Sequence, residues 1–170
     1  IKILLKIKRE FPSLWHAVEA LNGIIFQITF YKKIYRSLLE NLKKYSFQYK
    51  YRLLNNSDLD LLYYFLSNQD ERQLKYFKPH DFDKKTLKEL MHNPSFFMMG
   101  VFDGKELIGY FFLRCFINKQ CFTGRIIARE YQGKGISKPM GKILLESAWN
   151  SNFRVFCTVS KNNLNSLAAI

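Results

Sequence analysis

Two glycines separated by one residue, Gly133 and Gly135, lie between an apolar stretch and a segment with helical spacing. Gln132, Lys134 and Lys138 surround them. A strand that passes through a glycine loop into a helix is a general device for binding phosphate. The amides of the loop and first helical turn lack partners, and the helix dipole adds roughly half a positive charge. The pattern predicts a phosphate-binding loop, and an ordinary glycine turn is the alternative.

The spacing excludes two common nucleotide-binding loops. A nucleotide P-loop has a glycine five positions before its Gly-Lys pair and a Ser or Thr after it. Here Ala128 occupies the earlier position, and Gly135 follows Lys134. A GxGxxG dinucleotide motif that began at Gly133 would place its third glycine on Lys138. The residues therefore favour a loop for some other phosphate-bearing ligand.

The elements that position this loop are predicted from hydrophobic periodicity and turn signals. Strands are expected over 49–54, 95–103, 106–116, 121–128 and 153–160, and helices over most of the first fifty residues and over 58–68, 84–93, 137–152 and from 162 onward. The turns at 103–105 and 117–120 make the three middle strands an antiparallel meander. Because a helix separates 121–128 from 153–160, that pair is expected to be parallel. The fold class is a mixed α/β sheet.

Some side chains can be placed more closely. Ser57 or Asn56 is the expected cap of the helix over 58–68, and Ser137 that of the helix after the loop. Pro139 fits only a first helical turn. The inner face of the helix over 137–152 is expected to be Met140, Ile143, Leu144 and Ala148, and that of the first basic helix to be Tyr31, Ile34, Tyr35, Leu38, Leu42 and Tyr45.

The segment from Gln132 to Ser137, QGKGIS, resembles the Q/R-x-x-G-x-G/A signature of the GNAT superfamily of acyl-CoA-dependent N-acetyltransferases. The order of elements, two helices and then a meander before the loop, is also that of this family. The resemblance covers roughly residues 49–170 and implies a GNAT-like fold, truncated at its C-terminus. It departs at Ser137, where the family has Gly or Ala. Residues 1–48 are then a basic, mostly helical N-terminal extension.

The resemblance implies that acetyl-CoA is the co-substrate, with no metal. Its pyrophosphate would lie on the amides from Gly133 to Ser137, near Lys134 or Lys138. The residues expected to bind the coenzyme are Ile126, Ile127, Ala128, Gln132, Gly133, Lys134, Gly135, Ile136, Ser137, Lys138, Asn163 and Ser166. Asn163 and Ser166 match a second family motif, for which Asn165 with Ala168 also fits.

The resemblance implies direct attack by an amine on the thioester, but the general base is open. The strand over 121–128 carries no carboxylate, so Glu71, His80 and Asp81 are weak candidates from a polar loop, each with solvation as the alternative role. Arg125 indicates either an acceptor with an acidic group or a buried ion pair. The alternative function is a non-catalytic acyl-CoA-binding or regulatory module of the same fold.

Charge and cysteines bound the partners. The chain has 27 Lys and Arg against 14 Asp and Glu, and residues 1–50 carry ten against three. This excess favours polyanions, but no nucleic-acid-binding motif accompanies it, so nucleic acid is not expected. The basic N-terminal helix is a candidate for contact with a membrane surface or a protein partner.

The cysteines Cys115, Cys121 and Cys157 are expected to be buried reduced thiols of a cytoplasmic protein. The missing initiator Met and the abrupt end suggest a piece of a longer protein.

Overall fold

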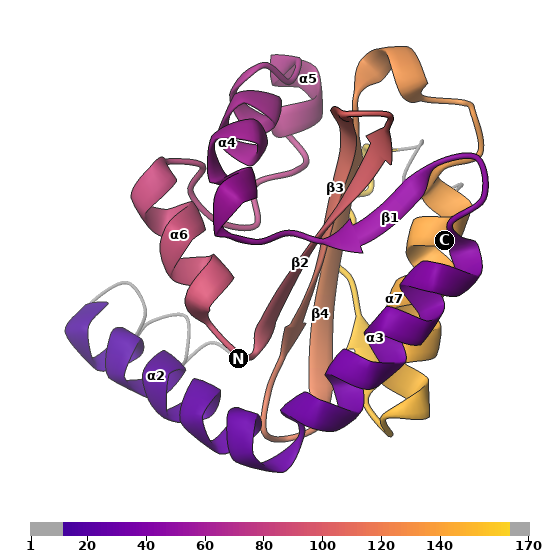
Figure 1. The fold of residues 1–170 in the computed structure, drawn as a ribbon. Helices are drawn as coiled ribbons and strands as arrows, with labels where there is room; N and C mark the ends of the chain where they lie inside the picture. Colours follow the sequence, from indigo (N-terminus) through magenta and orange to yellow (C-terminus); the bar gives the residue numbers. More distant parts are fainter. Residues whose placement is uncertain (1–11, 164–170) are drawn as a thin grey trace.

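A five-stranded sheet organises the computed structural model, which describes residues 12–163, with side chains from Ala17 onward. The strands lie in chain order: β1 (Lys50–Leu53), β2 (Phe96–Asp103), β3 (Glu106–Cys115), β4 (Gln120–Ile127) and β5 (Arg154–Phe156). Neighbouring strands from β1 to β4 are antiparallel, and β4 with β5 is parallel. The predicted meander and parallel pair are confirmed (Figure 1).

Helices cover both faces of the sheet. They are α2 (Pro12–Thr29), α3 (Tyr31–Tyr45), α4 (Leu59–Ser67), α5 (Glu71–Leu74), α6 (Lys84–His92) and α7 (Ser137–Asn150). Helices α3 and α7 lie side by side on one face, while α4, α5 and α6 lie on the other (Figure 1). The mixed α/β class is therefore confirmed.

On the face covered by α3 and α7, these two helices contribute aliphatic side chains, and the sheet adds aromatic ones such as Phe97 and Phe111. The helical side chains are Ile34, Leu38 and Leu42 from α3 and Met140, Ile143, Leu144 and Ala148 from α7, all buried. The predicted inner face of the helix over 137–152 is confirmed. In α3 the predicted stripe is too wide, because Tyr35 is 36% exposed while Ser37 and Asn41 are buried in its place. Asn41 Nδ2 donates to Ser147 Oγ of α7 (3.1 Å) and to the Ser37 carbonyl (2.9 Å).

The face covered by α4, α5 and α6 is aromatic. Phe96 and Phe112 stack with centroids 5.0 Å apart, and Tyr110, fully buried, packs beside Phe112. Leu62, Leu66 and Leu87 close this core from the helices. Arg52 of β1 also packs on this core. Its guanidinium pairs with both carboxylate oxygens of Asp58 (2.6 and 2.7 Å) and lies over the Phe102 ring of β2.

Four local predictions are corrected. The capping side chain is Asn55 rather than Asn56 or Ser57, and it caps the 3₁₀ turn Asn56–Asp58 that leads into α4. Asn55 accepts from the Ser57 amide while Asp58 accepts from the Asn55 amide, forming a capping box. Ser137 is the first residue of α7, and no side chain caps that helix. The last strand ends at Phe156, so only part of 153–160 is extended. Cys157 is exposed, whereas Cys115 and Cys121 are buried, because it lies beyond the end of β5.

Candidate functional site

The glycine loop connects β4 to α7 through a single 3₁₀ turn, Arg129–Tyr131. Gly133 and Gly135 have φ values of +76° and +78°, a region that side chains with a Cβ rarely adopt. A Cβ added at either glycine would meet no atom within 4 Å, so the space above both residues is open. The two glycines are therefore required by the backbone path and leave the loop accessible to a ligand.

The amides of this loop are without hydrogen-bond partners among the described residues. Within residues 12–163, the N–H groups of Gly133, Lys134, Gly135, Ile136 and Ser137 have no recorded acceptor, and Lys138 is the first whose N–H bonds back, to the Gly135 carbonyl (3.3 Å). Uncapped amides at a helix N-terminus attract anions, and the helix dipole acts in the same direction. This geometry agrees with the predicted phosphate-binding loop.

Side chains on both sides hold the loop in place. The Tyr131 hydroxyl donates to Glu106 (3.2 Å) and lies 3.4 Å from Asp103, which ties the loop to the β2–β3 hairpin. Desolvation and these carboxylates raise the pKa of Tyr131 to about 12, so it stays protonated at neutral pH. Gln132 Nε2 donates to the Ile127 carbonyl (3.3 Å), and Arg129 pairs with Asp70 (3.1 Å). The loop is therefore anchored at the residues just before its first glycine.

The two lysines of the loop are exposed and differ in where they lie. The Lys134 ammonium is 4.3 Å from the centre of the Tyr131 ring, a cation–π contact. Lys138 lies in the first turn of α7. Ile136, by contrast, is buried in the α3/α7 core and fixes the loop from below. Both ammonium groups can reach a bound anion without any change of the backbone.

The strand before the loop has an open edge, because β5 pairs with β4 only from Gln120 to Phe122. Main-chain groups alternate in direction along a strand. The Ala128 amide donates to the Ile108 carbonyl of β3 (2.9 Å), and the Ala128 carbonyl accepts from Tyr131 (2.9 Å). Both main-chain groups of Ala128 are therefore occupied. Ile127 is one residue out of phase and turns its main chain toward the open edge.

Arg125 lies on the α7 side of β4. Its guanidinium donates to the Ser137 carbonyl (3.4 Å) and contacts Gly141, where any larger residue would meet it. Burial lowers the pKa of this guanidinium. Its position beneath the first turns of α7 brings positive charge to the base of the loop. It faces away from the α4–α6 side, so the expected contact with an acidic acceptor is not what this geometry favours.

His80 lies in the long loop between α5 and α6, yet its ring packs against Phe82, Phe96, Tyr110 and Phe112. The Asp81 carbonyl lies 2.8 Å from Nδ1, and since a carbonyl only accepts, Nδ1 carries the proton. Nε2 then accepts from the Tyr110 hydroxyl (3.1 Å). Burial lowers the pKa of His80, so the ring is neutral at pH 7.

The other two candidates for a base are exposed. Glu71 begins α5, and Asp81 follows His80 in the loop. On β4 itself, Gly124 occupies the position that faces the aromatic side: a Cβ there would come within 2.5 Å of Phe112 and 3.1 Å of Phe77. On this side, β4 therefore lies against the rings of Phe112 and Phe77, and the strand carries no carboxylate, as its sequence predicts.

The second family motif is only partly visible. Asn163 lies in a turn, where its amide donates to the Ser160 carbonyl (2.9 Å). Ser166, Asn165 and Ala168 lie outside the described residues, as does the helix expected from 162 onward. The choice between the two registers of this motif therefore stays a prediction.

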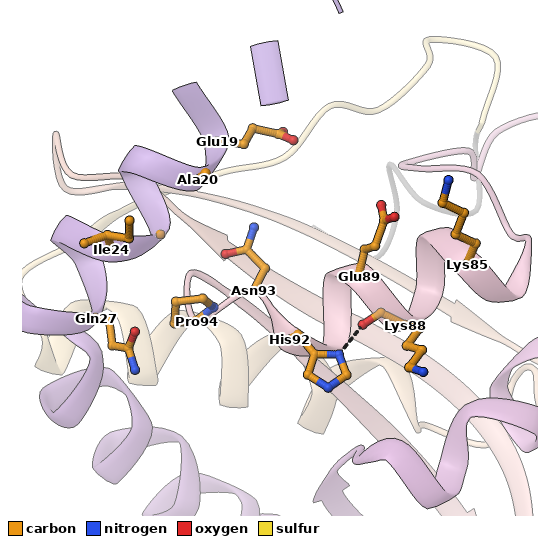
Figure 2. A pocket seen from close by; sticks show the side chains of 11 residues that line it. Glu19, Ala20, Ile24, Gln27, Lys85, Lys88, Glu89, His92, Asn93 and Pro94 are labelled. Carbon is orange, nitrogen blue, oxygen red and sulfur yellow. Dashed lines mark hydrogen bonds between the residues drawn. The ribbon is translucent and has the colours of Figure 1, made fainter. Parts of the chain in front are cut away.

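The geometry also bears on other kinds of site: a metal centre, a membrane span and a separate groove. Residues 12–163 contain no group of three or more His, Cys, Asp or Glu side chains placed to hold a metal ion. None of the helices described is long and apolar enough to span a membrane. A groove of about 590 Å³ opens between α2 and α6, and its lining includes none of the glycine-loop residues (Figure 2).

Comparison with known proteins agrees with this geometry. A family model described as an acetyltransferase (GNAT) domain matches residues 65–166. A search of curated proteins found no match.

Among solved structures, the spermidine N-acetyltransferase from Vibrio cholerae, in complex with CoA and spermine, is similar over 72% of this chain and 77% of that one, with 23% identity and a TM-score of 0.58. The GNAT domain of PAT from S. lividans matches over 71% and 77%, with 13% identity and a TM-score of 0.63. The ribosomal-protein-S5-alanine acetyltransferase from Vibrio fischeri matches over 72% and 76%, with 17% identity and a TM-score of 0.61.

These structures share the fold, and the family model covers more than half of the chain, including the glycine loop and both strands beside it. The chain belongs to the GNAT family of acetyltransferases.

Proposed function

We propose that this chain is an N-acetyltransferase that transfers an acetyl group from acetyl-CoA to a primary amine. The observation that carries the proposal is the glycine loop, with its unpaired amides, between an open strand edge and the uncapped start of α7. The CoA complex of the Vibrio cholerae neighbour supports the choice of coenzyme. A cytoplasmic location remains part of the proposal.

The proposal assigns parts of the coenzyme to particular residues. The pyrophosphate lies on the amides from Gly133 to Ser137, and Lys134 and Lys138 add full charges. The Ile127 N–H pairs with the pantetheine arm along the open edge of β4, since the Ile127 carbonyl already accepts from Gln132, and its neighbours Ile126 and Ala128 shape that edge. The thioester is then held where β4 and β5 separate, beyond Phe122. Gln132 acts by positioning, because its amide group holds the Ile127 carbonyl.

The reaction follows from this placement. The neutral amine nitrogen attacks the thioester carbonyl, a C–N bond forms, the C–S bond breaks, and the sulfur leaves as a thiolate that takes up a proton. Holding the two reactants side by side supplies much of the rate enhancement. A main-chain N–H on the open edge of β4 stabilises the developing oxyanion.

The proton on the amine has no assigned acceptor. His80 is neutral, but its Nε2 is already engaged by Tyr110, so it positions the loop between α5 and α6 and is a poor base. Glu71 and Asp81 remain candidates from the loop that borders the acceptor side. A chain of water molecules would serve equally well on a strand without a carboxylate.

The coenzyme assignment is tested by titrating acetyl-CoA into the protein and into Gly135→Asp, with calorimetry as the readout. The new carboxylate would lie at the pyrophosphate, so we expect the Kd to rise at least about tenfold. The matched control is Gly104→Asp in the β2–β3 hairpin, since Gly104 also has a positive φ (+58°) and open space around it. Equal binding by Gly135→Asp, or no binding by the unmodified protein, would refute the proposal.

The enzyme and the non-catalytic module are separated by thiol release. Acetyl-CoA is incubated with the protein and a panel of amines: a polyamine, an aminoglycoside and a peptide with a free N-terminal alanine. The printed names of the neighbours motivate the first and last of these. An enzyme releases free CoA only with an acceptor, whereas a binding module that still binds acetyl-CoA releases none with any of them.

A further inference from the structure

The outer face of α2 carries an exposed apolar row. Its members are Val18, Leu21, Ile24, Ile25 and Ile28, with exposed fractions of 44%, 58%, 58%, 37% and 82%. Spacings of three and four residues place them on one side of the helix. Single exposed apolar side chains are ordinary, but five neighbours on one helix face mark an interaction surface. We refer to these five residues as the α2 row.

The opposite side of α2 already packs on the domain. Phe26 is fully buried in the α3/α7 core, and Asn22 hydrogen bonds to Ser95 and to the Cys115 carbonyl. Glu19, the only charged residue from 12 to 29, pairs with Arg114 of β3. The helix is therefore apolar on the side away from the protein, although its anchored side already has Phe26, Asn22 and Glu19 to hold it on the domain.

Basic residues lie near the α2 row on two other helices, beside an acidic residue of the groove, Glu89. Lys32, Lys33 and Arg36 follow it on the exposed side of α3, and Lys85 and Lys88 lie on α6 across the groove from Ile24 (Figure 2). In the sequence, four more basic residues precede α2: Lys2, Lys6, Lys8 and Arg9. An uncharged apolar strip bordered by lysines matches a membrane interface, where apolar side chains enter the acyl boundary and lysines meet anionic headgroups.

We propose that the α2 row docks this protein on an anionic lipid surface. The charges argue against a second copy as the occupant, because a self-association through α2 would bring the lysines of both copies together. The stripe of the basic helix α3, an alternative membrane face suggested by the sequence, is buried in the protein's own core and unavailable for docking.

The proposal is tested by cosedimentation with vesicles of phosphatidylcholine alone and of phosphatidylcholine with about 30% phosphatidylserine, because anionic headgroups attract Lys and Arg side chains near the surface. We expect binding to the anionic vesicles, weakened at high salt.

Leu21→Glu/Ile28→Glu should lower the fraction of protein bound to vesicles at least about tenfold, and Leu21→Gln/Ile28→Gln, without new charges, should also lower it. Lys32→Gln/Lys33→Gln should lower it by roughly fivefold per charge. The control is Phe47→Glu, since Phe47 is 90% exposed but lies outside the row.

Circular dichroism on each variant confirms that the fold is kept, as expected for exposed positions. The proposal is overturned if the unmodified protein does not sediment with anionic vesicles, or if the glutamate and glutamine variants bind as it does. Light scattering supplies another decisive result: a dimer that the Leu21→Glu/Ile28→Glu change converts to a monomer would show that a second copy covers the row.

Discussion

The two faces of the sheet are built in different ways. On the α3/α7 face, two long helices pack aliphatic side chains on the sheet, and the polar groups between them satisfy one another in pairs. On the α4–α6 face, short helices and a long loop close over aromatic rings, with His80 inserted among them. The first arrangement supports the glycine loop through the buried Ile136, and the second lies beside β4 on the side where we propose that an acceptor approaches.

The largest effect should come from two buried leucines, one on each face. Leu38 of α3 and Leu87 of α6 are both fully buried. Leu38→Ala should cost about 4 kcal/mol of unfolding free energy and Leu87→Ala about 2–3 kcal/mol, because short elements can close around a cavity better than two long packed helices. Urea denaturation measures both, and the exposed neighbour Leu39→Ala, about 0.5 kcal/mol or less, is the control. A larger loss for Leu87→Ala would reverse the comparison.

A smaller difference in unfolding free energy is expected when a buried polar group is removed from each face. Tyr110→Phe removes the donor to His80 Nε2 and leaves a buried acceptor without its partner, at a cost of about 1–3 kcal/mol. Ser147→Ala should cost about 1 kcal/mol or less, because Asn41 keeps its bond to the Ser37 carbonyl. Thermal unfolding of the two single variants measures the difference. If Ser147→Ala were the more damaging, the α3/α7 face would depend on its polar link more than its packing indicates.

The smallest effect is a pH dependence that belongs to the α4–α6 face alone. The pKa of His80 is lowered from 6.5 mainly by burial, so the folded protein binds this proton less readily than the unfolded chain. The stability that His80 contributes is therefore present above pH 6.5 and is lost as the pH falls toward the lower folded pKa, at no more than about 1.4 kcal/mol per pH unit.

The measurement is unfolding free energy between pH 5 and 8 for the protein and for His80→Gln. The two curves should converge as the pH falls, because only the unmodified protein loses this contribution. His92→Gln, which removes an exposed imidazole on α6, is the control. Parallel curves for His80→Gln would mean that the ring is not held neutral in the folded state.

The sequence predicted the features that local patterns determine better than those that depend on distant contacts. Periodic apolar residues identify a helix and its inner face, which is why Met140, Ile143 and Leu144 were placed correctly. The two turn signals likewise identified the meander, and the glycine spacing identified the loop. All of these patterns are local, because each depends only on residues that are close together in the sequence.

The rest depends on contacts between distant residues. Nothing beside His80 in the sequence indicates that it packs on Phe96 and Phe112, because those rings come from strands further along the chain. The sequence did not indicate that Arg125 lies beneath α7 and donates to the Ser137 carbonyl, because that contact depends on the register of β4. The capping residue of the turn before α4 was misplaced by one or two residues, because Asn55, Asn56 and Ser57 are all good capping residues and only the Asp58 bond selects among them.

The packing of α3 has a practical consequence for anyone who shortens this chain. The family model begins at residue 65, and β1 begins at Lys50, so both would suggest starting a recombinant fragment after α3. Such a fragment would uncover Phe111, Met140 and Leu144, which now pack in one core with Ile34 and Leu38. We expect it to aggregate on expression, and a fragment that begins before Phe26 to remain in solution.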